Sequence, residues 1–472
     1  MKKIQFLFFA VLYLGIGIAK AQYTVLLNFD SAKGISPAGN LTFIGHKFYG
    51  MANGGGAYND GCVFSIDTDG TGYKDLLDFK GINGSHPNGS LLLSGGTLYG
   101  MTNTGGKYAF YGCVFSIDTD GSGYTDIHDF NYDIVNGNGE EPMGSLTISG
   151  NKLFGMTQYG GRQGYGSIFS INLNGSNYKD LFDFNNTNGG LPSGSLLIEG
   201  DKMFGMTSRG GAYSDGCAFS IDTSGNNYKD LLDFNGTNGQ YPNGDLTLTG
   251  NKLFGMTSGG GIHAMGCIFS IDSDGNGYKD LTDFMNSNGE NPDGTLNLIG
   301  NVLYGMVQGG GAYHYGCIFS LDSNGSNFTD IIDFNDINNP LGGYPYGSLT
   351  FVGPTMYGMA RLGGTKNMGV IFKLDTANLT TSINKITASN FINIFPNPST
   401  GIFTFQSNSE ELKGKSVEVF NVLGERVLKQ ILRSAQDDKV INLNNQPNGV
   451  YFYRIIAEDG GLIGEGKLVI QK

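Results

Sequence analysis

The chain has 472 residues, including 78 Gly, 25 Tyr, 32 Phe and no Trp, and its formal net charge is −13. This length allows two or three domains, and abundant Gly and aromatic residues favour short strands joined by tight turns over a helical fold. The acidic charge argues against nucleic acid as a partner, because phosphate binding requires a basic face.

The N-terminal segment is typical of a secretory signal peptide. Two lysines precede an apolar stretch from Ile4 to Ile18, and the triplet AKA at 19–21 fits the small-x-small cleavage rule. We therefore expect cleavage between Ala21 and Gln22, which removes residues 1–21. An uncleaved membrane anchor is the alternative, which the short apolar stretch disfavours. No other segment is long and apolar enough to cross a bilayer.

A Gly-Met pair recurs along the chain and marks an internal repeat. Its seven copies begin at Gly50, Gly100, Gly155, Gly205, Gly255, Gly305 and Gly358. In the unit from Gly89 to Phe130 we expect strands in GSLLLSG, TLYGMTN, GCVFSID and YTDIHDF, because each run is bounded by Gly, Asn, Asp or Pro. Four short strands in about 50 residues are typical of one β-propeller blade, and a kelch blade has about this period.

The two ends of the repeat region favour a closed ring over an open solenoid of stacked hairpins. A fourth-strand phrase, YTVLLNF at Tyr23–Phe29, precedes all other strands, and the last unit ends at Gly369–Asp375 without a fourth strand. The first phrase can complete the last unit and remove the open edges that a solenoid must cap. We expect an all-β fold with a seven-bladed propeller of four-stranded repeats over 22–376, in which strand 23–29 closes the last blade.

Residues that recur in every unit are most simply explained by the needs of the fold. The Phe of the third strand, Phe64 in the first unit, is expected in the core. Pro-x-Gly before each first strand, beginning with Pro37, is expected to form a turn, because Pro fixes φ and Gly permits a positive φ. The Asp before the last Phe, such as Asp78, is expected to bind backbone amides of the following loop.

The cysteines and turn carboxylates give little support for a disulfide framework or a metal. All five cysteines occupy one repeat position, which fits a small buried side chain better than a disulfide framework or a C-x-x-C metal site. They are Cys62, Cys113, Cys217, Cys267 and Cys317. The turn DTDGTG at Asp67–Gly72 has the alternating oxygens of a calcium loop, but Asp78 stands where that loop requires Glu, so a hairpin turn is favoured. We expect no cofactor and no metal.

Positions that differ between units are the candidates for a ligand site. In a propeller whose first strand is innermost, the loops between strands 2 and 3 and between blades share one face. A polar residue two positions after each Met, here called the polar ring, is expected at the mouth of the central channel: Asn53, Asn103, Gln158, Ser208, Ser258, Gln308 and Arg361. Just beyond it stands an aromatic set: Tyr58, Tyr108, Tyr165, Tyr213, His263 and Tyr313. A pre-proline set also varies: Ser36, His86, Glu141, Leu191, Tyr241, Asn291 and Tyr344.

These residue types favour a binding module over an enzyme. Amide and hydroxyl groups beside aromatic faces suit sugars and also peptides, although loop ends are often polar and Tyr-rich without any ligand. No nucleophile–base pair and no single carboxylate pair breaks the pseudo-symmetry, as catalysis would require. Arg361 is the one clear departure in the polar ring. Non-catalytic binding, first of glycans, is the leading hypothesis, and a glycosidase or lyase and a structural or adhesive surface protein are the alternatives.

After Asp375 the repeat stops, and the polar stretch 377–390 is expected to be a linker. NIFPNPSTGIFTF, VEVFNVLGERV, NLNNQPNGVYFYRI and GKLVIQK then follow within 391–472, and their alternation predicts a small antiparallel β-sandwich. These phrases closely resemble the type A sorting domain of the type IX secretion system, with PNP-x-x-G-x-F, VFN-x-x-G-x-x-V, GVY and KLVI-x-K in family order.

This resemblance implies export from a Gram-negative cell. The signal peptide would direct the chain through the inner membrane, and the tail would engage the type IX secretion machinery at the outer membrane. The tail is then usually removed, and the cargo is released or attached to surface lipopolysaccharide. The repeats over 40–376, with their G-C-[VI]-F-S-[IL]-D core, look like the GloVer tandem-repeat family of surface and secreted proteins. That resemblance implies no established activity.

Overall fold

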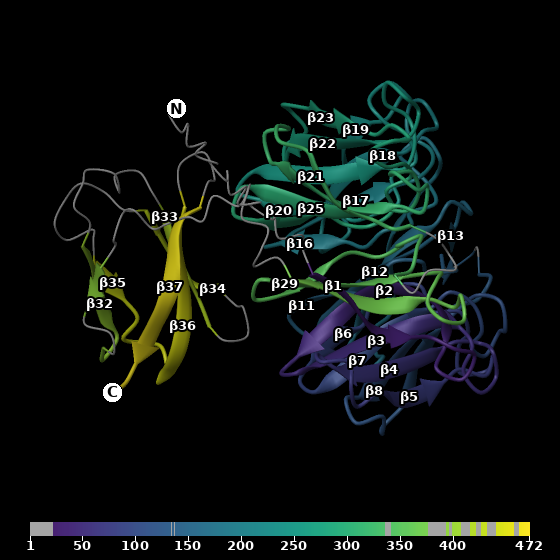
Figure 1. Cartoon of the computed structure of the whole chain (residues 1–472), viewed down its shortest axis with the longest axis horizontal. Coiled ribbons are helices and arrows are strands. Elements are labelled where there is room, and N and C mark those ends of the chain that lie inside the picture. The colour runs from purple at the N-terminus through teal and green to yellow at the C-terminus, as the bar shows by residue number, and fades with distance from the viewer. Residues whose placement is uncertain are drawn as a thin grey trace, which may run out of the picture.

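Figure 1 shows the computed structural model of the chain. The structure describes residues 22–133, 135, 137–335, 341–375, 393–395, 399–406, 416–421, 426–431, 440–456 and 462–472. The expected signal peptide with Ala21, residue Thr376 and the expected linker 377–390 lie outside the described residues. Within the described ranges the regular secondary structure is all β-strand, and no helix there is long and apolar enough to span a membrane.

The repeat region contains seven four-stranded antiparallel sheets, which we number in chain order. The second sheet consists of β6 (Leu92–Ser94), β7 (Thr97–Thr102), β8 (Cys113–Asp118) and β9 (Thr125–Asp129). The four strands predicted for this unit are therefore confirmed, although the first is shorter than GSLLLSG. The chain before β6 bonds to a neighbouring sheet instead, since Ser90 N donates to Ser145 Oγ at 2.8 Å.

Five other sheets repeat this pattern, with longer first and second strands in the first sheet. They are β2 (Ile35–Ile44), β3 (Lys47–Gly54), β4 (Cys62–Asp67) and β5 (Lys74–Asp78); β11 (Thr147–Ser149), β12 (Lys152–Thr157), β14 (Ser167–Asn172) and β15 (Lys179–Asp183); β16 (Leu197–Glu199), β17 (Lys202–Thr207), β18 (Cys217–Asp222) and β19 (Lys229–Asp233); β20 (Thr247–Thr249), β21 (Lys252–Thr257), β22 (Cys267–Asp272) and β23 (Lys279–Asp283); and β24 (Asn297–Ile299), β25 (Val302–Val307), β26 (Cys317–Asp322) and β27 (Thr329–Asp333). A two-stranded ribbon, β10 (Gly139–Glu140) with β13 (Tyr159–Gly160), lies in the loops of the third unit.

The seventh sheet joins the two ends of the repeat region. It comprises β28 (Thr350–Val352), β29 (Thr355–Ala360) and β30 (Val370–Asp375), and β1 (Gln22–Asn28) is its outermost strand. β1 runs antiparallel to β30, with Gln22 opposite Asp375 and Asn28 opposite Val370. The N-terminal strand thus takes the fourth position of the last sheet.

Each sheet packs on the next through a pair of buried Phe rings. The Phe after a fourth strand meets the third-strand Phe of the following sheet edge to face, with centroids 5.2 Å apart for Phe79 and Phe115. The same contact, at 5.4 Å, joins Phe29 after β1 to Phe64 of the first sheet. Edge-to-face pairs are favourable beyond their buried area. The predicted core role of the third-strand Phe is confirmed, since the Phe64 and Phe115 side chains have no exposed area.

The glycines of Pro-x-Gly form an inner circle where neighbouring sheets touch. A methyl group on Gly89 would overlap the carbonyl oxygen of Gly144, and one on Gly347 would overlap that of Gly39. The full set is Gly39, Gly89, Gly144, Gly194, Gly244, Gly294 and Gly347. Only Gly39 has a positive φ, of 72°. The prediction that these glycines serve a positive φ is therefore wrong for the other six, because close approach between sheets excludes their side chains.

The C-terminal region forms two further antiparallel sheets, drawn in yellow in Figure 1. One contains β31 (Asn393–Phe395), β32 (Ile402–Gln406) and β35 (Val440–Asn442), and the other β34 (Arg426–Ile431), β33 (Ser416–Phe420), β36 (Gly449–Ile456) and β37 (Leu462–Ile470). Both sheets contribute to one buried cluster, with Phe403 and Ile441 from the first and Val417, Tyr451 and Leu468 from the second.

Candidate functional site

The chain enters each first strand through a residue with left-handed backbone geometry. In the pre-proline set φ is 53° at Ser36, 54° at His86, 52° at Glu141, 51° at Leu191, 56° at Tyr241, 52° at Asn291 and 53° at Tyr344. Residues other than Gly seldom adopt a positive φ, and bulky ones least of all. Gly would remove this strain, yet every unit keeps a side chain there. Strain of this kind gathers at functional sites and points to a role for the side chains.

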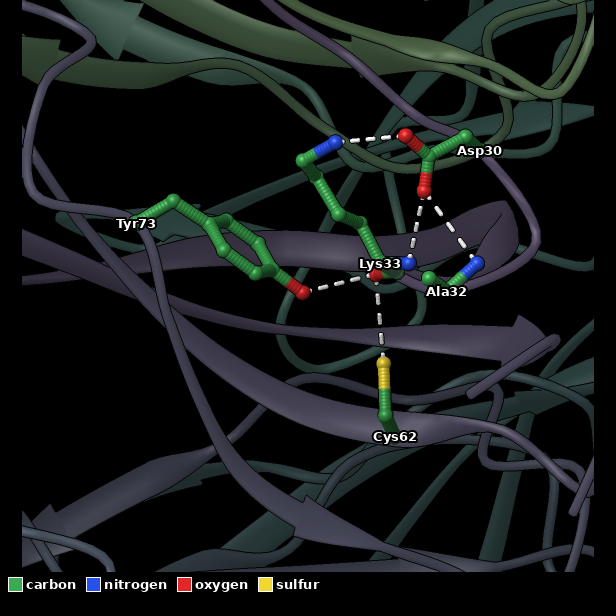
Figure 2. Close-up of polar contacts among 5 residues, drawn as sticks. All are labelled: Asp30, Ala32, Lys33, Cys62 and Tyr73. Atoms are coloured by element: carbon green, nitrogen blue, oxygen red, sulfur yellow. Dashed lines mark hydrogen bonds and ion pairs between the residues drawn. The ribbon is translucent and has the colours of Figure 1, made fainter. Parts of the chain in front are cut away.

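In four of the seven units a buried Cys and a Tyr anchor the loop that leads to the pre-proline residue. In the first sheet, Cys62 Sγ and Tyr73 OH both donate to the carbonyl oxygen of Lys33, at 3.4 and 2.7 Å (Figure 2). The Asp30 carboxylate accepts the backbone N–H groups of Ala32 and Lys33 at 3.1 and 3.0 Å and fixes the same turn. These bonds fix the backbone at Lys33, three residues before Ser36, and so fix the path of the loop.

The five cysteines are free and buried, as predicted. Burial raises the pKa of the Cys62 thiol to about 12, so the group stays protonated and can donate. The anchor recurs in other sheets: Cys217 Sγ and Tyr228 OH donate to the Asn188 carbonyl at 3.8 and 2.6 Å. The repeated Cys therefore holds a loop carbonyl in addition to filling space.

The polar ring lies beside a central pocket that residues of all seven units line. The pocket has an empty volume of ≈ 440 Å³, open solvent included, and the Pro-x-Gly turns form its wall. Asn53 Nδ2 donates to Asn88 Oδ1 at 2.8 Å, and Gln158 Nε2 donates to Ser193 Oγ at 3.2 Å. Asn88 and Ser193 line the pocket, so these ring residues lie at its rim.

Backbone bonds tie the polar ring to the pre-proline set. The N–H of Asn103 donates to the carbonyl of His86 at 3.2 Å, and that of Arg361 donates to Tyr344 at 3.3 Å. The equivalent bonds start from Gln158, Ser208, Ser258 and Gln308. In Ser208 and Ser258 the side-chain hydroxyl also donates to the pre-proline carbonyl, at 2.7 Å in each. The two variable sets therefore form one surface around the pocket.

The aromatic set lies farther out on the loops between second and third strands. The exposed fractions are 60% for Tyr58, 41% for Tyr108, 62% for Tyr213 and 52% for Tyr313, and His263 is also exposed. The Ala57 N–H, next to Tyr58, donates to Asp78 Oδ1 at the end of β5, the outermost strand, at 2.8 Å. None of these side chains lines the central pocket.

The repeated Asp before the last Phe therefore binds a backbone amide, but in a different loop from the one predicted. Asp129 accepts from Lys107 N and Asp233 from Ala212 N, both at 2.7 Å. Each of these amides belongs to the loop between the second and third strands, which precedes the Asp in sequence. The end of the fourth strand lies beside that loop, because the third strand runs antiparallel to both of its neighbours.

Tyr165 does not occupy the position of the other tyrosines in the aromatic set. Its carbonyl accepts the N–H of Leu191 at 2.8 Å, as the Asp215 carbonyl accepts that of Tyr241 at 2.9 Å. Tyr165 is thus equivalent to Asp215, two residues after the position of Tyr213. The loop of the third unit has Gln163 at the tyrosine position, which a sequence comparison by nearest aromatic residue misses.

One sector of the pocket carries unlike charged and aromatic side chains that sequence reasoning mostly missed. Asn243 Nδ2 donates to Asp293 Oδ1 at 2.9 Å. The Arg361 guanidinium lies 5.4 Å from the centre of the Tyr346 ring. Burial raises the pKa of Asp293, against the opposing effects of Asn243 and Arg361. The sequence signal that could have found these residues is the variation at the middle position of Pro-x-Gly. That position is occupied by Ala38, Asn88, Met143, Ser193, Asn243, Asp293 and Tyr346.

The turns between third and fourth strands behave as hairpin turns. Asp69 Oδ1 accepts Thr71 N at 2.9 Å and Thr71 Oγ1 at 2.7 Å, and Asp120 makes the same pair of bonds with Ser122. The carboxylates thus bind their own turns. In the part of the chain that the structure describes, no three His, Cys, Asp or Glu side chains gather as a metal-binding group.

Two family models match the chain. The Gloeobacter/Verrucomicrobia repeat matches in three overlapping copies, at residues 14–214, 97–265 and 199–403. The chain belongs to this repeat family. The model of the secretion system C-terminal sorting domain matches residues 393–471 of the same chain. Both predicted resemblances are confirmed, and the sorting domain marks the protein for export by type IX secretion, to be secreted or attached to the outer cell surface.

No curated protein matches this repeat protein. Among solved structures, a fungal alcohol oxidase of the AA5 family in complex with copper is 10% identical, with 96% of this chain and 100% of that chain covered and a TM-score of 0.50. A puromycin-hydrolysing peptidase of Mycobacterium tuberculosis is 10% identical, with 80% and 60% covered and a TM-score of 0.48. PorZ, a surface component of the type IX secretion system of Porphyromonas gingivalis, is 13% identical, with 92% and 59% covered and a TM-score of 0.43. The likeness to the oxidase bears on the fold alone.

Proposed function

We propose that the repeat region is a seven-bladed β-propeller, spanning 22–376, that acts as a non-catalytic binding module. The linker 377–390 would then join it to the sorting domain at 391–472. The circle of glycine contacts that returns from Gly347 to Gly39 supports closure of the ring. The observation that carries the binding role is the pre-proline set, where seven strained positions around one pocket keep differing side chains.

Glycans are the ligand class that this face suits best. The polar ring offers amide, hydroxyl and guanidinium groups at the rim of the pocket, and tyrosines such as Tyr213 present 62% of their side chain to solvent farther out. Sugars combine hydroxyl groups with apolar ring faces, so they pair with both kinds of side chain. The type IX signal adds that the face reaches the outside of the cell, where glycans are accessible.

A glycan array probed with the full exported chain tests the proposal. We expect saturable binding to a restricted set of glycans, weakened by Tyr213→Ala or Tyr313→Ala. Phe43→Ala is the matched control, because Phe43 is 38% exposed and precedes the β2–β3 turn at the other end of its sheet. A folded protein that binds no glycan on a broad array would contradict the proposal and favour a structural or adhesive role.

The runner-up function, a glycosidase or lyase, is tested with the same glycans. Asp293 beside Arg361 is the feature that favours it, because these unlike groups break the pseudo-symmetry at the pocket. Incubation of each array hit with the protein, followed by mass spectrometry of the sugar, separates the two functions. Binding without released product supports the module, and product formation that Asp293→Asn abolishes would replace it with an enzyme.

A further inference from the structure

Two arginines, Arg361 of the polar ring and Arg209 next to Ser208 of that ring, differ from the other described arginines in their partners. Arg162 pairs with Asp183 at 3.7 Å, and Arg426 and Arg454 pair with Glu418 at 3.0 and 2.7 Å. Within the described residues, Arg209 and Arg361 form no such ion pair. The chain has 42 carboxylate side chains for 29 Lys and Arg, so an arginine without a carboxylate partner is unexpected here.

Both arginines instead lie against tyrosine rings. The Arg209 guanidinium lies 3.8 Å from the centre of the Tyr241 ring, and that of Arg361 lies 5.4 Å from the centre of the Tyr346 ring. Tyr241 belongs to the pre-proline set, and Tyr346 lines the pocket. A cation–π contact engages the guanidinium without a carboxylate partner, so its N–H donors can make a bidentate contact with a planar carboxylate.

The acidic groups of the same pocket are already engaged. Asp293 accepts from Asn243 at 2.9 Å, and Asp245 accepts the backbone N–H of Ser195. The charge of Arg361 acts on Asp293, but no ion pair in the described part of the chain joins Asp293 or Asp245 to Arg209 or Arg361. The N–H donors of both arginines therefore stay available to a ligand.

The two arginines stand on sheets that are not adjacent. Arg209 follows β17 in the fourth sheet, and Arg361 follows β29 in the seventh. A single acidic sugar reaches one of them, whereas a chain that crosses the pocket reaches both. Between them, serines such as Ser195 and Ser348 and the Tyr346 ring line the wall, which suits the hydroxyl groups and apolar faces of the intervening sugars.

From these contacts we infer that the ligand is an acidic oligosaccharide whose sugar carboxylates bind Arg209 and Arg361. This inference rests on the proposed glycan-binding function and specifies its ligand class. It also assigns the specificity to two side chains that differ between units, while the other residues of the polar ring supply contacts that any sugar can use.

The test compares three forms of one oligosaccharide: uronic acid-containing, carboxyl-reduced and sulfated. The probe is the full exported chain, with affinity measured by titration calorimetry and folding checked by melting temperature. We expect carboxyl reduction to weaken binding by about ten-fold or more, since each charge-assisted bidentate contact contributes at least about that factor. Arg209→Met and Arg361→Met should each weaken binding of the acidic form similarly and weaken that of the reduced form much less.

Arg162→Met is the matched control, because Arg162 lies in the equivalent loop of the third unit and pairs with Asp183. It should leave the affinity for every form unchanged. Equal affinity for the acidic and reduced forms, indifferent to Arg209→Met and Arg361→Met, would overturn the inference and leave glycan binding standing. Preference for the sulfated form would overturn the carboxylate assignment. Absence of binding to every form and to the whole array would overturn the proposed function itself.

Discussion

The repeat region and the C-terminal region place carboxylates in opposite electrostatic surroundings. In the repeat region each complete unit holds two aspartates three residues apart, and burial together with the charge and hydrogen bond of Asp78 raises the pKa of Asp75 to about 6. In the C-terminal region the Glu418 side chain is 2% exposed and contacts Arg426, Lys429 and Arg454 at 3.0, 3.2 and 2.7 Å. Burial opposes ionisation of Glu418, but hydrogen bonds from Arg454 and Lys429 outweigh it and lower its pKa.

The difference teaches how each region uses its charge. In the repeats the second Asp of the pair is committed to a loop amide, as Asp183 is to Arg162 N at 2.8 Å. The pKa of the neighbouring Asp180 is raised, first by burial and then by the negative charge of Asp183. In the single-copy tail one carboxylate organises three cations from neighbouring strands. The repeats thus use carboxylates to position loops of the candidate face, and the tail uses one to hold its sheet together.

The largest expected effect comes from removing a ring between sheets of the repeat region. Phe169→Ala should lower the free energy of unfolding of that region by about 3–5 kcal/mol, because Phe169 has no exposed area and its loss leaves a cavity. Differential scanning calorimetry should show the transition of the repeats shifting while that of the tail stays in place. A shift of both transitions together would show that the two regions unfold as one unit.

A smaller effect is expected at the inner circle of glycines. Gly144→Ala should cost about 1–3 kcal/mol, since the added methyl group overlaps the carbonyl oxygen of Gly194 and the neighbouring sheet has to move. The matched control is Gly150→Ala, because a methyl group on Gly150 meets nothing within 4 Å and only its φ of 59° opposes the change. Urea unfolding measures both, and equal costs would contradict the close-approach explanation.

In the tail, Glu418→Gln should destabilise the C-terminal sheets by about 1–2 kcal/mol. The loss of a buried ion-pair partner is costly, but the three cations are about half exposed and water can solvate them, which reduces the cost. The melting temperature of the tail transition gives the measurement. Export assayed in the native host should fall in parallel, and an unchanged tail transition would show that the cluster adds no stability.

The smallest and most diagnostic effect is a difference in pH dependence. A carboxyl group whose pKa is raised on folding binds its proton more tightly in the folded state. The pKa values of Asp75 and Asp230 are raised from the ordinary value of 3.8 to about 6. The repeat region should therefore lose stability as the pH rises from 3.8 through about 6. The tail should behave oppositely: with the pKa of Glu418 lowered, its stability is complete above the ordinary Glu value of 4.5 and falls as pH drops below it.

Melting temperatures of the two transitions between about pH 3.5 and pH 7 test this difference. Asp75→Asn and Asp230→Asn together should flatten the slope of the repeat transition without changing that of the tail. Parallel slopes in the wild-type protein would show that overall charge, rather than these local surroundings, governs the pH response of both regions.

The strands were predictable because their signals are local. Runs such as GCVFSID are bounded by turn residues, and β8 begins at Cys113 and ends at Asp118, within the phrase. The pairing of β1 with β30 follows from comparing the two ends of the repeat. In the tail, where no internal copies exist, family motifs indicated export but said nothing of the contacts around Glu418.

The errors share a cause, which is contact between units. Gly89 looked like a turn glycine because its partner, Gly144, lies one unit away. The strained φ falls on residues such as Leu191 and Tyr241, whose side chains give no local signal of left-handed geometry. Asp293 and Tyr346 give no local signal of a site, since only contact between units brings the middle residues of Pro-x-Gly together at the pocket.

The central claim is that residues differing between units form the binding site, while repeated residues form the scaffold. The most direct test measures Kd for an array-selected glycan and the melting temperature together, for the wild-type chain and for Arg361→Met. We predict that Kd rises by about ten-fold while the melting temperature changes by less than about 2 °C. An unchanged Kd, or a loss of binding that accompanies unfolding, would contradict the account.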